Sequence, residues 1–165
     1  MQNKTYNVLV LCTGNSARSI LGEVLFNTLG KGRFKACSAG SKPAGRVNPG
    51  ALEWLKENGH STEGLRSKSW DEFAAPGAPE FDFIFTVCDN AAGETCPFWP
   101  GRPASAHWGI PDPAHIEGDA ARRAAFNKAA EQLTRRIQAF LALSFETMEP
   151  QALKQKLAEI GRIQD

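Results

Sequence analysis

Residues 6–19 read YNVLVLCTGNSARS, and this stretch decides the fold of the chain. Residues 6–12 are a short run rich in Val and Leu, which is typical of a strand buried on both faces. The small polar residues 13–16 end that pattern. From Ser19 to Gly30 apolar residues recur at helical spacing, so the sequence predicts a strand, a tight loop and a helix.

Strand and helix patterns alternate along the rest of the chain. The patterns predict strands over residues 34–38, 81–88 and 105–110, and helices over residues 49–58, 115–143 and 151–160. This alternation predicts an α/β fold, a single three-layer domain with a four-stranded parallel sheet and helices on both faces. We expect residues 1–143 to form this domain. Residues 144–165 are expected to form a C-terminal helical extension, packed on the same domain or on a partner.

The charge balance excludes several kinds of partner. Among 165 residues, Lys plus Arg number 19 and Asp plus Glu number 18, so the formal net charge is +1. This near-neutral balance offers no field for nucleic acid or an anionic membrane, and an anionic ligand would need local donors. No apolar run reaches the ~20 residues that span a bilayer, and no signal-peptide pattern is present. We expect a monomeric cytoplasmic protein.

Cys12 ends the first predicted strand, and Arg18 follows six positions later. The small residues between them let successive backbone N–H groups turn inward around an anion, and the following helix adds its positive end. Arg18 can close over the anion with a planar fork. The same donors are expected to lower the pKa of the Cys12 thiol and make it a nucleophile. The expected oxyanion-binding residues are Thr13, Gly14, Asn15, Ser16, Ala17, Arg18 and Ser19. The alternative is a buried thiol at an ordinary strand-to-helix turn.

The segment CTGNSARS, residues 12–19, resembles the signature of low-molecular-weight protein tyrosine phosphatases and of the arsenate reductases that share their fold. The resemblance covers about residues 6–141. It implies that Cys12 attacks arsenate or a phosphate-like oxyanion that Arg18 grips. It also implies that Asn15 and Ser19 brace the loop, and that Ser19 hydrogen-bonds the thiolate.

Asp112 lies between Pro111 and Pro113, after the fourth predicted strand. The two prolines stiffen the backbone around it, and composition alone would favour an ordinary turn. The resemblance makes Asp112 the general acid that protonates the departing oxygen. A Tyr commonly follows this Asp-Pro pair in the phosphatases, whereas Ala114 and His115 follow here, which argues against a phosphotyrosine substrate.

Two further cysteines favour a reductase over a phosphatase. Cys88 ends the third predicted strand, and Cys96 follows after seven residues. A phosphatase needs one cysteine, whereas thiols supply two electrons by forming a disulfide. The resemblance to thioredoxin-linked arsenate reductases implies that Cys88 attacks Cys12 and releases arsenite, and that Cys96 then forms the Cys88–Cys96 disulfide. Thioredoxin is the expected reductant, with glutathione and glutaredoxin as the other option. That both cysteines are inert thiols remains the alternative.

Neither a bound cofactor nor a metal is expected. A zinc site drawn from Cys88, Cys96, His107 and His115 does not match the spacing of paired zinc ligands. Lys68 stands near the position of an acidic residue of a potassium site in some relatives, so no bound cation is predicted. Position 17 is Ala where many relatives have a second loop cysteine, and Cys37 is expected in the core.

Two other functions remain open. The first is a phosphatase for phosphotyrosine or a small phosphate ester, using Cys12, Arg18 and Asp112; weak phosphatase activity is also compatible with a reductase. The second is a binding module that senses an oxyanion, which leaves the pairing of Arg18 with Asp112 unexplained.

Overall fold

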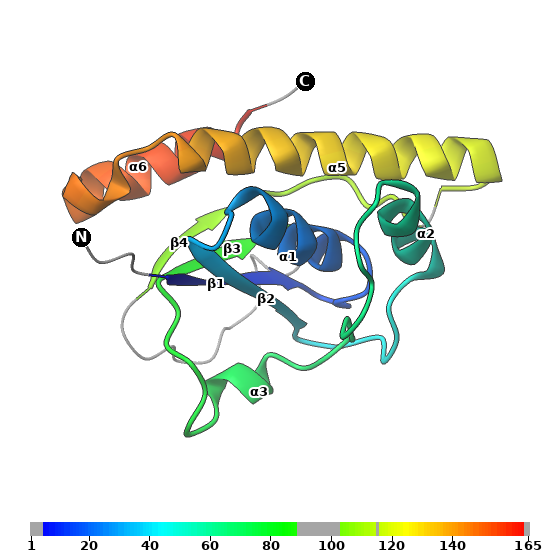
Figure 1. Cartoon of the computed structure of the whole chain (residues 1–165), viewed down its shortest axis with the longest axis horizontal. Coiled ribbons are helices and arrows are strands. Elements are labelled where there is room, and N and C mark those ends of the chain that lie inside the picture. Colours follow the sequence, from blue (N-terminus) through cyan, green and yellow to red (C-terminus); the bar gives the residue numbers. More distant parts are fainter. Residues whose placement is uncertain (1–4, 89–102, 115, 164–165) are drawn as a thin grey trace.

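A computed structural model describes residues 5–88, 103–114 and 116–163 of the chain, so Cys96 and His115 lie outside the described residues. The four strands of the described residues form one parallel sheet in the order β2-β1-β3-β4, as Figure 1 shows. The strands are β1 (Tyr6–Cys12), β2 (Phe34–Gly40), β3 (Phe83–Thr86) and β4 (Ala104–His107). The predicted α/β fold with four parallel strands is confirmed, although β3 and β4 are shorter than the patterns suggested.

The helices follow the order that the sequence predicts. They are α1 (Arg18–Leu29), α2 (Pro49–Glu57), α3 (Asp71–Ala74), α5 (Asp119–Leu141) and α6 (Pro150–Ile160), with a 3₁₀ turn η1 (Phe145–Thr147). The sequence patterns missed α3 and η1, because elements of three or four residues are too short to show a period. The predicted helix over residues 115–143 is shorter in the structure and begins at Asp119.

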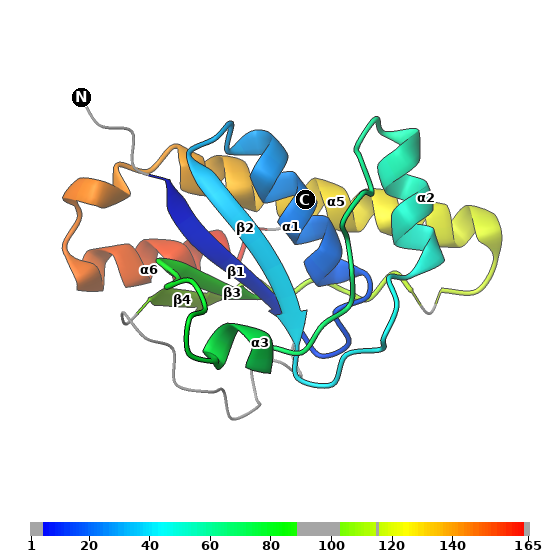
Figure 2. The same ribbon diagram turned by 60° about the horizontal axis from the view of Figure 1, so that its bottom comes forward.

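The two faces of the sheet are covered unequally. Along β1, Val8, Val10 and Cys12 belong to the larger apolar cluster, whereas Leu9 and Leu11 belong to a smaller one on the opposite face. The larger cluster is filled by α1, α5 and α6, which lie together on one side of the sheet in Figures 1 and 2. The short α3 lies on the other side. The predicted helices on both faces are therefore present, with most of the core under the larger set.

Close helix packing depends on one glycine of α1. A Cβ atom at Gly22 would lie 2.9 Å from Cγ1 of Val10 in β1, nearer than non-bonded carbons approach. The missing side chain lets α1 settle directly on β1. Since α1 begins at Arg18, this contact fixes where the loop between β1 and α1 lies.

The C-terminal helix packs on the same sheet edge as the fourth strand. Trp108, which directly follows β4, is buried, and its indole Nε1 donates a hydrogen bond to the Leu157 carbonyl of α6 at 2.9 Å. The ring of Trp108 stacks on Phe85 of β3 with centroids 3.8 Å apart. These contacts join α6 to the core of the sheet.

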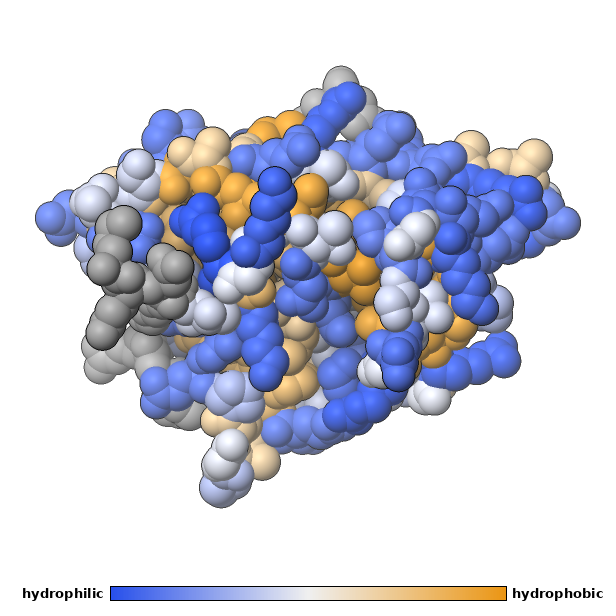
Figure 3. All heavy atoms as spheres, viewed as in Figure 1, coloured by the Kyte–Doolittle hydropathy of each residue, from blue (hydrophilic) through white to orange (hydrophobic). Residues whose placement is uncertain are grey.

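The outer surface is mostly polar. Hydrophilic side chains dominate the face drawn in Figure 3, and among the described residues Ile116 is the large apolar side chain counted as exposed. Within the described ranges, no helix has both the length and the apolar composition that crossing a membrane requires.

Candidate active site

The loop between β1 and α1 lies at the carboxyl end of the sheet, where ligands bind in open parallel sheets. Because β1 pairs with both β2 and β3, Cys12 lies opposite Gly40, and Leu11 lies opposite Thr86. Cys88 follows Thr86 by two residues and so arrives beside the loop. The sheet topology thus brings together two cysteines that are 76 positions apart.

The carbonyl groups of the loop are directed to a neighbouring backbone segment. The carbonyls of Thr13, Gly14 and Ser16 accept hydrogen bonds from the amides of Lys42, Ala44 and Asn48 at 3.0, 2.9 and 2.8 Å. The amides of Thr13 and Gly14 donate to sulfur instead, Thr13 to Cys88 and Gly14 to Cys12. The loop therefore presents donors on its inner side, as an anion-binding nest requires.

Asn15 holds the loop in a conformation that few residues adopt. Its φ is +45°, in the left-handed region, and the residue is fully buried. The side-chain Oδ1 accepts from the Lys68 amide at 2.9 Å, and Nδ2 donates to Ser19 Oγ at 2.8 Å. Asn15 and Ser19 therefore hold each other across the loop, whereas the suggested bond from Ser19 to the thiolate stays a prediction.

Gly40 and Ser67 support the loop from outside, and sequence reasoning missed both. A Cβ atom at Gly40 would lie 2.4 Å from the carbonyl oxygen of Thr13. The Ser67 hydroxyl donates to the Gly14 carbonyl at 3.1 Å. A glycine at the end of the second strand was the only available signal, since nothing in the sequence links residue 67 to residue 14.

A buried charged network lies beneath Asn15. The ammonium of Lys68 donates to the Arg66 carbonyl at 3.1 Å and lies 3.8 Å from Oε1 of Glu23, which also accepts from Ser38 Oγ at 2.6 Å. Burial lowers the pKa of Lys68, while the Glu23 carboxylate opposes that shift. The charge at position 68 is thus an internal ammonium with its own oxygen partners.

Arg18 connects the loop to the segment that carries Asp112. Its Nη1 donates to the Ile110 carbonyl at 3.1 Å, and its Nη2 lies 3.6 Å from Oδ2 of Asp112. The other oxygen of Asp112 accepts from the Ala114 amide at 2.9 Å, which orients the carboxylate. Both side chains remain partly exposed, at 17% and 30%, so a solute can reach them. Among the described residues no side chain caps the start of α1, and uncapped helix amides are the groups that bind an anion.

The two described thiols at the site contact each other. Cys12 and Cys88 are both buried, and a side-chain hydrogen bond joins them. That bond and burial raise the pKa of the Cys12 thiol, while the Arg18 guanidinium and the Gly14 amide lower it. The raising influences are stronger, so the expected lowering of this pKa is wrong for the arrangement seen here. The family resemblance led us to expect Cys88 near Cys12, but the sequence did not show that this contact would raise the pKa of the Cys12 thiol.

The remaining sequence candidates lie elsewhere. Cys37 is half-buried in β2 and packs against the smaller apolar cluster, and burial raises the pKa of its thiol. His107 shares a 2.8 Å hydrogen bond between its Nδ1 and the Thr86 hydroxyl. Within the described residues, no three His, Cys, Asp or Glu side chains gather as a metal site. Cys96 and His115 lie outside the described residues.

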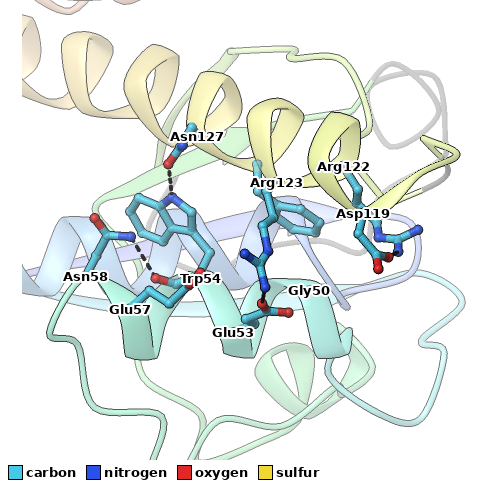
Figure 4. A pocket seen from close by; sticks show the side chains of 10 residues that line it. Gly50, Glu53, Trp54, Glu57, Asn58, Asp119, Arg122, Arg123 and Asn127 are labelled. Carbon is cyan, nitrogen blue, oxygen red and sulfur yellow. Dashed lines mark hydrogen bonds and ion pairs between the residues drawn. The ribbon is translucent and has the colours of Figure 1, made fainter.

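A separate cleft of about 450 Å³ lies between α2 and the start of α5, as Figure 4 shows. Trp54 donates from its indole nitrogen to Asn127, and Arg123 pairs with Glu53 across the cleft. Neither cysteine nor Arg18 lines it. The cleft is therefore distinct from the anion-binding loop.

Comparisons with known proteins agree with the geometry. A family model described as low molecular weight phosphotyrosine protein phosphatase matches residues 7–158. An arsenate reductase of Halalkalibacterium halodurans is 34% identical over 134 residues, which are 81% of this chain and 93% of that protein. The arsenate reductase structure from Archaeoglobus fulgidus gives a TM-score of 0.60 at 30% identity, covering 79% of this chain and 98% of that one. The thioredoxin-dependent arsenate reductase of Corynebacterium glutamicum has the same fold, with a TM-score of 0.60 at 22% identity over 86% of this chain and 62% of that one.

Proposed function

The chain belongs to the low molecular weight phosphotyrosine protein phosphatase family, and we propose that within it the protein is an arsenate reductase. The observation that carries the proposal is the position of Cys88 beside the loop that begins at Cys12: its sulfur accepts a hydrogen bond from the Thr13 amide at 3.3 Å and interacts with the Cys12 thiol. Hydrolysis of a phosphate ester uses a single nucleophile, whereas reduction of arsenate needs two electrons, which a pair of thiols supplies. The curated relative from Halalkalibacterium halodurans is likewise named an arsenate reductase.

In the first step of the proposed reaction, arsenate enters the loop of residues 12–18. The guanidinium of Arg18 binds the oxyanion, and Cys12 gives its proton to an arsenate oxygen and attacks arsenic. Asp112 gives a proton to the departing oxygen, which leaves as water. Arsenic is still in its +5 state, covalently bound to the Cys12 sulfur. The 3.6 Å approach of Arg18 to Asp112 supports this division of roles.

In the second step the thiolate of Cys88 attacks the Cys12 sulfur. A Cys12–Cys88 disulfide forms, the sulfur–arsenic bond breaks, and its electron pair leaves with arsenic, which is released as arsenite in its +3 state. The two thiols lose two electrons and arsenic gains two, so the step balances. The hydrogen bond from the Thr13 amide to Cys88, at 3.3 Å, supports the role of Cys88 because it places that sulfur beside the residue that follows Cys12.

In the third step Cys96 attacks Cys88, moves the disulfide to the Cys88–Cys96 pair and frees Cys12. A thioredoxin then reduces that disulfide. The similar Corynebacterium glutamicum protein is named a thioredoxin-dependent arsenate reductase, and this supports the same donor here. Glutathione with glutaredoxin is the other candidate donor.

The test is arsenate-dependent consumption of NADPH in the presence of thioredoxin and its reductase. Cys12→Ser, Cys88→Ser and Cys96→Ser are each expected to abolish turnover, while Cys37→Ser, a matched change outside the site, keeps it. If Cys96→Ser remains active with glutathione and glutaredoxin, the protein is still a reductase but the donor differs.

A phosphatase for a small phosphate ester is the second candidate, because Cys12, Arg18 and Asp112 serve both reactions. Hydrolysis of an aryl phosphate separates the two candidates. If Cys88→Ser retains this hydrolysis while the wild type consumes no NADPH with any thiol donor, the reductase proposal fails and the phosphatase takes its place.

A further inference from the structure

A buried arginine outside the described site holds the backbone that leads to Asp112. Arg136 lies in the second half of α5 and is only 4% exposed. Its Nη1 donates to the carbonyls of Trp108 and Gly109 at 2.8 and 2.9 Å, and its Nη2 donates to the Ile163 carbonyl at 3.1 Å. Burying a guanidinium is costly, so three carbonyl acceptors gathered on one side chain indicate a specific role.

The carbonyls that Arg136 holds begin the segment from β4 to Asp112. The next carbonyl, that of Ile110, accepts from Arg18 of the anion-binding loop at 3.1 Å. Two arginines thus hold three successive carbonyls. Arg136 in the core binds the first two, and Arg18 in the site binds the third. Beyond them Pro111 and Pro113 restrict the backbone on either side of Asp112, so the position of its carboxylate follows the position of this segment.

The chain after α6 takes part in the same contact. A Cβ atom at Gly161 would lie 2.4 Å from the His107 carbonyl and 2.9 Å from Cδ1 of Trp108, so this backbone lies directly on the end of β4. The Trp108 indole donates to the Leu157 carbonyl of α6. The Ile163 carbonyl then reaches the Arg136 guanidinium. Residues 161–163 therefore cover Arg136, which holds the backbone that leads to Asp112.

We propose that Arg136 is a positioning residue for Asp112, and that residues 161–163 complete its hold on the backbone. The proposal rests on the proposed function only through the role of Asp112 as proton donor, a role that reduction of arsenate and hydrolysis of a phosphate ester share. The described bonds of Arg136 go to backbone carbonyls and act on Asp112 through the segment that leads to it. Its loss is therefore expected to lower the rate of the chemical step and to leave oxyanion affinity in place.

The experiment compares Arg136→Lys with Arg135→Lys, the same substitution at the exposed neighbour on α5. A lysine keeps the charge but lacks the planar fork that reaches three carbonyls. General acid catalysis contributes about 10²–10⁴-fold, so we expect kcat for arsenate to fall roughly tenfold or more in Arg136→Lys. The KM for arsenate and the Kd for sulfate, measured by calorimetry, are expected to stay within about twofold. Arg135→Lys is expected to match wild type in all three.

A second readout uses aryl phosphates whose leaving groups differ in pKa. A displaced acid slows poor leaving groups more than good ones, so Arg136→Lys is expected to depend more steeply on leaving-group pKa than wild type. Hydrogen exchange at residues 108–114 is expected to quicken, while exchange at residues 8–11 of β1 stays slow. If wild type does not reduce arsenate, the proposed function fails, and these two readouts still decide the role of Arg136.

Removal of residues 162–165 is the second variant, because it deletes the Ile163 acceptor and leaves Arg136 and Gly161 intact. It is expected to shift kcat and exchange at residues 108–114 in the same direction as Arg136→Lys, by a smaller amount. The proposal is overturned if both variants fold and leave exchange and leaving-group dependence unchanged. A loss of sulfate affinity as large as the loss of kcat overturns it as well, because the effect would then lie in the loop.

Discussion

At the scale of single residues, Cys12 is subject to opposing influences. The Cys88 contact and burial favour its neutral thiol, and Arg18 with the Gly14 amide favours its thiolate. Since the first pair of influences is stronger, the pKa of the Cys12 thiol is raised in this arrangement, and the contact with Cys88 contributes most to that shift.

Replacing Cys88 by Ala tests this balance. Because the hydrogen bond to Cys88 is the largest influence raising the pKa of Cys12, its removal is expected to lower that pKa. Alkylation of Cys12 by iodoacetamide, followed by mass spectrometry of its peptide, is expected to set in at lower pH than in wild type. Cys37→Ala serves as the control and is expected to leave the alkylation profile unchanged. An unshifted profile in Cys88→Ala would show that burial alone holds the proton on Cys12.

Asn15 allows backbone strain to be separated from hydrogen bonding. Both Asn15→Ala and Asn15→Gly remove the bonds to Lys68 and Ser19, but only Ala keeps a Cβ at a φ of +45°. A left-handed conformation costs an L-residue about 1–2 kcal/mol, so Ala is expected to destabilise the protein by that much more than Gly. Urea unfolding of the three proteins measures the difference. Equal losses would mean that the loop relaxes away from this conformation in the variants.

Prediction from sequence was good for residues close together in the chain. The Cys12–Arg18 loop lies between β1 and α1, where the sequence predicted a change from strand to helix. The approach of Asp112 to Arg18, 94 positions away, was expected only from the family resemblance. Partners far along the chain were missed, as the bond from Ser67 to Gly14 shows. The expectation of a lowered pKa for Cys12 was wrong because it took no account of Cys88, whose contact raises that pKa most.

At the scale of elements, the end of β2 shapes the loop after β1. A methyl group added at Gly40 would lie 2.4 Å from the Thr13 carbonyl oxygen. Because that oxygen belongs to the backbone, it cannot move away by a side-chain rotation. Gly14 belongs to the loop itself, yet the nearest atom to its Cβ would be Ser16 Oγ at 3.7 Å. The loop is therefore more tightly packed from outside than within.

This difference predicts opposite outcomes for two glycines. Gly40→Ala is expected to lower the free energy of unfolding by about 1–3 kcal/mol, the usual cost of overpacking, and to weaken sulfate binding. Gly14→Ala is expected to change the free energy of unfolding by less than about 1 kcal/mol, since neither its φ nor its surroundings exclude a methyl group. Thermal and urea unfolding of both variants check the pair. A larger loss for Gly14→Ala would contradict the packing described here.

Helices were predicted correctly where the segment was long enough to show the helical repeat of apolar residues. The helix expected over residues 49–58 is α2 (Pro49–Glu57), whose N-cap Asn48 accepts from the Gly50 amide. Strands three and four ended earlier than predicted, because apolar residues continue into the loops on either side of them. Phe81 precedes β3 and Val87 follows it, and both are buried without being strand residues.

At the scale of the whole molecule, stability is concentrated on one face of the sheet. Phe140 of α5 is fully buried, and its ring lies within 6.2 Å, centroid to centroid, of six other aromatic rings: Phe26, Phe34, Phe83, Phe85, Trp108 and Phe145. On the opposite face Phe73 is only partly buried and pairs with Phe81. The two phenylalanines thus report on the two faces separately.

Phe140→Ala is expected to cost about 3–5 kcal/mol, the range for deleting a buried aromatic ring. At about 2–4 °C of melting temperature per kcal/mol for a chain of this size, the midpoint is expected to fall by roughly 6–20 °C. Phe73→Ala, the matched change on the other face, is expected to lower the midpoint by less than half as much. Calorimetry of both variants measures the ratio. Similar losses would show that the smaller cluster contributes more than its burial suggests.

The outward-facing carbonyls of the loop also bear on the direction of turnover. Thr13, Gly14 and Ser16 direct their carbonyls to the amides of residues 42–48, whereas the Thr13 and Gly14 amides point to the sulfurs of Cys88 and Cys12, and the Arg18 guanidinium lies nearby. These donors attract a dianion strongly and an uncharged molecule only weakly. Arsenate is a multiply charged anion at neutral pH, whereas arsenous acid is neutral there. For a reductase, the chemical step would itself discharge the ligand, so the product would leave without a lid or a pump to expel it.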